Sequence, residues 1–155
     1  MLQEKIKSLQ FWLVVASVAL YILSMFFTPF YVESPKADIY SNSFYILLSG
    51  WMAILGGGLI PTIIWLANPL YLSAAFFIMN KSKLGIVPAT LSLILAIYFT
   101  TLSSIMDGES GAMKDITGLG AGFYCWISSF IIIFFAGMIL FTEKKEEVKI
   151  TPQSQ

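Results

Sequence analysis

The stretch from Phe44 to Met79, FYILLSGWMAILGGGLIPTIIWLANPLYLSAAFFIM, decides the fold of this chain, because its 36 residues include no charged side chain. A single membrane crossing needs about 20 apolar residues, so this stretch is too long for one simple crossing. Two breaks divide it, one at glycines 56–58 with Pro61 and one at Asn68-Pro69. The stretch therefore predicts two helical pieces, of which the second, 59–79, is long enough to cross.

The composition predicts an integral membrane protein. Of the 155 residues, 57% are hydrophobic and 12% are charged, whereas soluble domains carry roughly 25% charged residues. The length allows one membrane domain, residues 1–142, and a charged cytoplasmic tail, 143–155, which we expect to be disordered. The net charge is zero, so nothing predicts a nucleic-acid partner, and the lipid bilayer is the first expected partner.

Four apolar stretches predict four membrane helices, near residues 11–27, 59–79, 86–106 and 121–141. The polar segments between them contain prolines or glycines and are expected to be loops or turns. The remaining apolar piece, about 44–56, is expected to be an interfacial or re-entrant helix, or a continuation of the second helix. The predicted fold is an all-α membrane bundle of four helices with this one extra helical segment.

The lysines predict the orientation of the bundle. Seven of the nine lie in the N-terminal lead, in the turn at 80–85 and in the tail, whereas only Lys36 and Lys114 lie in the other two loops. Under the positive-inside rule the lead, the turn and the tail are cytoplasmic. Four crossings satisfy this pattern and five do not, so both termini are expected in the cytoplasm.

Asn68-Pro69 falls near the middle of the second predicted crossing. Proline removes a backbone hydrogen bond, and the asparagine side chain can satisfy a freed backbone group or bond to a neighbouring helix. One interpretation is a broken helix whose carbonyls and amide line a small polar site, as in transporters. The other interpretation is a structural kink that neighbouring helices seal.

A ligand site, if the chain has one, is expected in the outer half of the bundle. It would lie between the break at Asn68 and Pro69 and a rim formed by Trp51, Tyr124 and Trp126. No ionisable residue lies in the core of any predicted crossing, so the site would suit a neutral or amphipathic ligand such as a lipid. The chain has no arginine and no histidine, and its single cysteine cannot form a thiolate cluster, so no catalytic residue, metal or cofactor is predicted.

Three segments carry a resemblance to a known group of proteins. They are GWMAILGGG (Gly50–Gly58), WLANPL (Trp65–Leu70) and ITGLGAGFYCWISS (Ile116–Ser129), and the likeness covers roughly residues 25–140. Together they resemble a group of small, uncharacterised four-helix bacterial inner-membrane proteins. The resemblance implies a multi-pass protein of the bacterial inner membrane and implies no catalytic activity.

Two classes of function remain from these observations. The first expectation is a non-enzymatic membrane protein that acts through protein–protein contact, as a helper subunit or an immunity-type factor, with another membrane protein or a second copy of itself as partner. The alternative is an oligomeric channel or carrier for a small solute that uses the broken helix at Asn68-Pro69.

Overall fold

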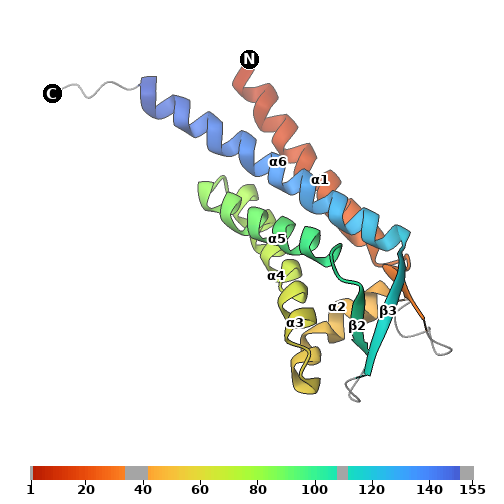
Figure 1. The fold of residues 1–155 in the computed structure, drawn as a ribbon. Coiled ribbons are helices and arrows are strands. Elements are labelled where there is room, and N and C mark those ends of the chain that lie inside the picture. The colour runs from red at the N-terminus through yellow and green to blue at the C-terminus, as the bar shows by residue number, and fades with distance from the viewer. Residues whose placement is uncertain (1, 34–41, 108–111, 151–155) are drawn as a thin grey trace.

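The computed structural model describes residues 2–33, 42–107 and 112–150, and it is mostly helical. Two long helices, α1 (Leu2–Ser24) and α6 (Ala121–Ile150), lie side by side along the molecule (Figure 1). The start of α1 and the turn that joins α4 to α5 lie toward one end, and the strands and α3 lie toward the other. We call the second end the sheet end.

The predicted helix at 59–79 is present as two helices that meet at one residue. α3 (Leu59–Trp65) and α4 (Ala67–Met79) are separated only by Leu66. After α4, the amide of Ser82 bonds to Phe77 O at 2.9 Å, and Lys81 takes a left-handed φ of 55°. Together these features form a Schellman motif, a cap that commonly ends helices. A short 3-10 helix, η3 (Lys83–Gly85), then leads into α5 (Ile86–Phe99).

The extra helical piece expected at 44–56 is confirmed. It consists of α2 (Ser43–Ser49) followed directly by a 3-10 helix, η2 (Gly50–Gly56). Asn42 begins it, because its side chain accepts a hydrogen bond from the amide of Tyr45. Gly57 ends it with a φ of 84°, a conformation that favours glycine. The α2–η2 segment is therefore separate from α3 rather than its continuation.

The all-α prediction is wrong, because three short strands form an antiparallel sheet in the order β1-β3-β2. β1 (Phe30–Val32) pairs with β3 (Ala112–Leu119), and β3 pairs with β2 (Ser104–Asp107). The interpretation of this region as loop rested on its glycines and acidic residues. Pairing with a strand about 90 residues earlier, Phe30 with Leu119, supplies the backbone hydrogen bonds that a loop would lack.

The predicted ends of three helices also need correction. α5 ends at Phe99 rather than at residue 106, because Thr100 and Thr101 turn their hydroxyls onto the carbonyls of Ile97 and Tyr98. α1 begins within the polar lead and ends at Ser24, before the predicted end at residue 27. α6 continues to Ile150, so residues 143–150 are helical where a disordered tail was expected, and 151–155 lie outside the described residues.

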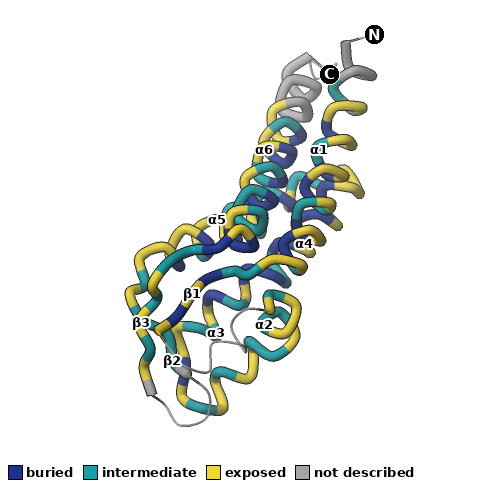
Figure 2. Tube along the Cα trace, turned by 90° about the vertical axis from the view of Figure 1, so that its right-hand side faces the viewer, coloured by how far each residue is buried: buried dark blue, intermediate teal, exposed yellow. Residues whose placement is uncertain are grey.

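Two clusters of buried side chains hold these elements together. The larger one joins α1, α4, α5 and α6, and the smaller one joins α3, α5 and α6 to the strands. Figure 2 shows the buried positions along the facing sides of the helices, whereas α2 has none. Two helical paths, Leu59–Met79 and Ala121–Thr142, are long and apolar enough to cross a membrane by length and composition.

Candidate functional site

At the break between α3 and α4, the side chain of Asn68 satisfies a backbone carbonyl that Pro69 leaves without its helical hydrogen bond. Pro69 has no N–H group, so it cannot donate the helical hydrogen bond to the carbonyl of Trp65, four residues earlier. The side-chain amide of Asn68 donates to that same carbonyl at 3.0 Å. Asparagine therefore replaces the bond that proline removes, which the sequence interpretation had given as one role of Asn68.

The carboxamide oxygen of Asn68 joins two further helices. It accepts a hydrogen bond from the Tyr21 hydroxyl of α1 at 3.1 Å and from Trp126 Nε1 of α6 at 2.9 Å. Asn68 is 8% exposed, and among the described residues the only buried side-chain N or O atom without a partner is Gln10 Nε2. Asn68 is thus held on three sides, by α1, α3 and α6.

A column of aromatic rings continues from this point into the bundle. Tyr21 stacks on Tyr71 with ring centres 4.6 Å apart, and Tyr71 stacks on Phe130 at 4.8 Å. Trp126 lies against Phe130 at 4.6 Å. The Tyr71 hydroxyl lies 2.8 Å from Ser17 Oγ, which in turn donates to the carbonyl of Ser129 at 2.7 Å. We call these residues, together with Asn68, the polar core.

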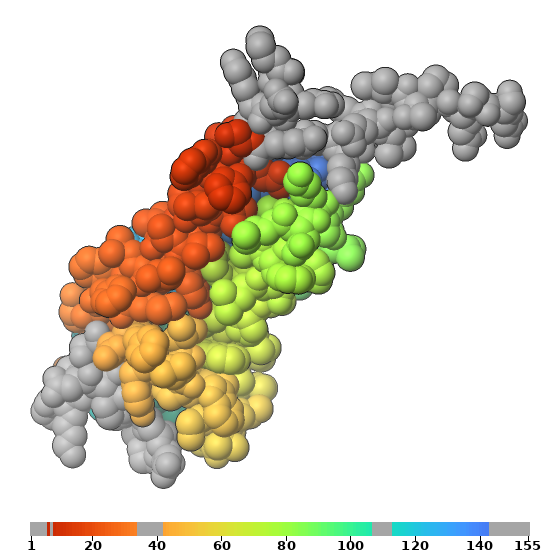
Figure 3. All heavy atoms as spheres, turned by 180° about the vertical axis from the view of Figure 1, so that it is seen from behind, coloured from red at the N-terminus to blue at the C-terminus, as the bar shows by residue number. Residues whose placement is uncertain are grey.

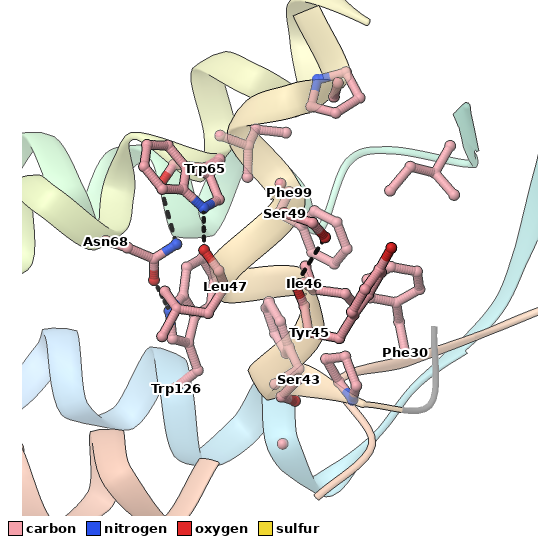
Figure 4. A pocket seen from close by; sticks show the side chains of 18 of the residues that line it. Phe30, Ser43, Tyr45, Ile46, Leu47, Ser49, Trp65, Asn68, Phe99 and Trp126 are labelled. Atoms are coloured by element: carbon pink, nitrogen blue, oxygen red, sulfur yellow. Dashed lines mark hydrogen bonds between the residues drawn. The ribbon is translucent and has the colours of Figure 1, made fainter. Parts of the chain in front are cut away.

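A cavity of about 620 Å³ lies beside the polar core, at the sheet end. Tyr21, Asn68 and Trp126 of the polar core are part of its lining, and Figure 4 shows the hydrogen bond between Asn68 and Trp126. Further lining residues come from the end of α1, α2, η2, α3, the end of α5, the start of α6, and strands β1 and β2. None of the described residues that line it is charged. We call it the sheet-end cavity, and its volume is typical of sites for small molecules, which span roughly 300–1,000 Å³.

Four of the polar side chains of the cavity lining already have partners. Trp65 Nε1 donates to the carbonyl of Leu47 at 2.7 Å. Three serine hydroxyls donate to backbone carbonyls on their own or a neighbouring segment, and these serines are Ser24, Ser43 and Ser49. A bound molecule would therefore meet mainly apolar surface, and a charged group would find no opposite charge there.

One wall of the cavity is the α2–η2 segment, which has no buried residue. Figure 3 shows this segment, in light orange, between the orange end of α1 and the yellow to green α3 and α4. Gly50 packs closely against the Trp65 indole, because a Cβ built at Gly50 would be 2.5 Å from Trp65 Cδ1. Elsewhere in the lining, Pro29 and Gly122 are held by backbone hydrogen bonds, because the amides of Gly120 and Gly122 donate to Pro29 O and Thr28 O.

The structure brings together only part of the predicted site. Asn68 and Trp126 are hydrogen-bonded and both line the cavity. Pro69 is half-buried beside Asn68 and is not part of the lining, and Trp51 and Tyr124 are 48% and 58% exposed on the outside. Of the three residues of the predicted aromatic rim, Trp126 therefore belongs to the cavity lining, and Trp51 and Tyr124 do not.

Other lining residues were not predicted. Trp65 and Ile64 lie one helical turn before Asn68, so their spacing would have placed them on the same side of the helix. Phe30, on β1, also lines the cavity, but its place depends on the pairing of distant strands, for which the sequence carries no local signal.

Comparison with protein-family models, with curated proteins and with solved structures found no match to this chain.

Proposed function

We propose that this chain is a four-crossing membrane protein that acts by binding rather than by catalysis, with the sheet-end cavity as its binding site. In this role it serves another membrane component, as a helper subunit or an immunity-type factor does. The single observation that carries the proposal is the uncharged cavity of about 620 Å³ beside a sealed polar core. Its lining suits the uncharged, apolar part of a partner.

Helix lengths and burial support the four crossings. Besides the two long apolar paths, Ser8–Ser24 and Lys83–Phe99 are apolar helices of up to 17 residues, near the shortest length that spans a bilayer. The most apolar windows of the two long paths are only 39% and 33% buried. A core helix of a soluble protein would be mostly buried, so this outward apolar surface is better suited to lipid.

The arrangement of charge supports the orientation. The start of α1 and the lysine-containing turn between α4 and α5 lie toward the same end, away from the sheet. The positive-inside rule then assigns that end to the cytoplasm and the sheet end to the outer side of a bacterial inner membrane. A Ser82→Cys variant, with Cys125 replaced by serine, tests this. A membrane-impermeant thiol reagent should label it only after the membrane is opened, and labelling of intact cells would contradict the orientation.

Binding through the cavity is tested by a matched pair of tryptophan substitutions. Leu102 is half-buried in the cavity lining, and Leu72 is exposed on α4 outside it. Purification in mild detergent should recover a stoichiometric partner with wild type and Leu72→Trp, and should lose it with Leu102→Trp. Equal recovery with all three proteins would contradict binding through the cavity.

A carrier of small uncharged solutes is the second candidate function, and one observation favours it. The cavity extends from the sheet end to Asn68, beside the break between α3 and α4. Purified protein in liposomes separates the two candidates. Solute flux above that of empty liposomes would favour the carrier, and a co-purified partner without flux would favour the binding role.

A further inference from the structure

The α2–η2 segment has apolar side chains on both of its sides. Ile46, Leu47 and Ala53 face the cavity as part of its lining. Large side chains on the same segment are exposed and lie outside the lining, among them Phe44, Leu48 and Ile54. In the proposed orientation this segment lies near the outer membrane–water boundary, with its exposed apolar side chains against lipid. A wall one helix thick would then separate lipid from the cavity.

Side-chain hydrogen bonds tie this wall to its neighbours near its start and its middle. The Ser43 hydroxyl donates to Phe27 O at its start, and Trp65 Nε1 donates to Leu47 O near its middle. Its second half is a 3-10 helix of seven residues, whereas runs of more than three or four are uncommon because their hydrogen bonds are poorer. A segment with no buried residue and with the poorer hydrogen bonds of a 3-10 helix belongs to the part of a protein that opens most easily.

Gly57, at the C-terminal end of the wall, is the hinge about which the wall can turn. Its φ of 84° lies in the left-handed region, and nothing lies within 4 Å of a Cβ built there. At the other end of the wall, the Ser43 hydroxyl donates to Phe27 O and Asn42 caps the first turn of α2. Breaking the bond between Trp65 Nε1 and Leu47 O would therefore free the middle of a segment that already has open space at its hinge.

We propose that the sheet-end cavity takes one hydrocarbon tail of a lipid from the outer leaflet, and that α2–η2 is the movable wall through which the tail enters. The inference rests on the proposed function, whose ligand class it names. The cavity is uncharged, and its serine and tryptophan donors already form hydrogen bonds within the protein. It therefore favours an acyl chain, which forms no hydrogen bonds. A lipid headgroup stays outside, at the level of the exposed Trp51.

Photo-crosslinking tests where the tail lies. The protein is reconstituted in vesicles of phosphatidylethanolamine and phosphatidylglycerol that contain a phosphatidylcholine with a diazirine on one acyl chain. After illumination, mass spectrometry should find adducts on cavity residues such as Met25 and Ile64, as well as on lipid-facing ones such as Phe135. Adducts confined to the lipid-facing residues would overturn the proposal.

Filling the cavity provides the matched control. Leu102→Trp should reduce the cavity adducts at least fivefold and leave those on Phe135 unchanged, whereas Leu72→Trp should leave both unchanged. Ser49→Phe, at a half-buried position of the wall, is a second filling variant should Leu102→Trp fail to fold. Cavity adducts that persist at full yield in a folded filling variant would contradict occupancy of the cavity.

Two further variants test the wall. Trp65→Phe keeps an aromatic ring and loses the bond to Leu47 O, so cavity adducts should form about fivefold faster. Trp51→Phe changes a tryptophan on the wall itself that lies outside the cavity lining, so it should leave the rate of adduct formation unchanged. Equal rates in wild type and Trp65→Phe would overturn the wall as the entry route.

The final arm separates this inference from the proposed function. In an Ile46→Cys variant that lacks Cys125, a charged thiol reagent should fail to react in vesicles, because hydrocarbon fills the cavity. Rapid reaction would show a cavity filled with water and would overturn the hydrocarbon ligand. The binding role would still stand or fall on the recovery of its partner with Leu102→Trp.

Discussion

The polar core and the sheet-end cavity share three residues but differ in how deeply their residues are buried and in where their hydrogen bonds go. Tyr21, Asn68 and Trp126 belong to both. On the core side, α1, α4 and α6 contribute buried rings or hydroxyls, and the hydrogen bonds cross between these three helices. On the cavity side, the wall has no buried residue and its polar groups bond mostly to nearby backbone. Substitutions should therefore affect stability on one side and binding on the other.

Tyr71→Ala should have the largest effect on stability. Tyr71 is fully buried between Tyr21 and Phe130, and its hydroxyl lies against Ser17. Its removal leaves a cavity and takes away one of the two hydrogen-bond partners of Ser17 Oγ, and should lower the free energy of unfolding by about 3 kcal/mol. Reversible unfolding in mixed micelles measures this. Tyr45→Ala, at an exposed tyrosine of the wall, should lower it by less than about 1 kcal/mol.

Asn68→Leu should have the next largest effect. Leucine cannot bond to Trp65 O, and it leaves the donors of Tyr21 and Trp126 without their acceptor. A loss of about 2 kcal/mol is expected, near the upper end for hydrogen bonds between membrane helices. Asn80→Leu is the control, because the Asn80 side chain bonds only to Phe76 O at the exposed end of α4. An equal loss for both variants would contradict the role of Asn68 as the link between helices.

Gln10→Leu should stabilise the protein. Gln10 is 5% exposed on α1, and its Nε2 has no hydrogen-bond partner. Leucine has a similar size and no donor, so the free energy of unfolding should rise by about 1 kcal/mol. Gln10→Glu, which keeps the shape and adds an acid, should lower it. A lower melting temperature for Gln10→Leu would mean that the amide is bonded after all.

Alanine at two glycines of the wall should have the smallest effect on global stability. Gly57→Ala strains a left-handed residue by about 1 kcal/mol without any steric clash. Gly50→Ala pushes the wall away from Trp65 instead. Hydrogen exchange should therefore speed up across α2–η2 in Gly50→Ala, and the amides of α4 should be unaffected. Faster exchange in α4 as well would show that the wall and the core open together.

The sequence predicted the helical parts of this fold because their signals are local. The apolar runs located α2–η2, the α3–α4 path and α6, and the proline in Asn68-Pro69 pointed to the backbone group that Asn68 satisfies. The strands were not predicted, because Phe30 pairs with Leu119, which is distant in the sequence, and no local sequence pattern indicates this pairing.

The candidate site was predictable to the same limited degree. Asn68 was predicted as a polar group that needs partners in an apolar helix, and Trp126 was predicted as part of the aromatic rim; the structure joins the two by a hydrogen bond. Trp51 and Tyr124 were chosen as a rim from their expected depth in the membrane, but depth does not fix which way a side chain points. Their exposure shows that both face outward instead.

If the polar core stabilises the bundle and the sheet-end cavity binds the ligand, unfolding and acyl-chain crosslinking should respond to different substitutions. Both are measured on the same vesicle samples of Tyr71→Ala, which lies in the polar core and outside the cavity lining, and of Leu102→Trp, which lies in the lining. We expect Tyr71→Ala to unfold more easily and keep its cavity adducts, and Leu102→Trp to keep its stability and lose them. Loss of the cavity adducts from folded Tyr71→Ala protein would refute this division between core and cavity.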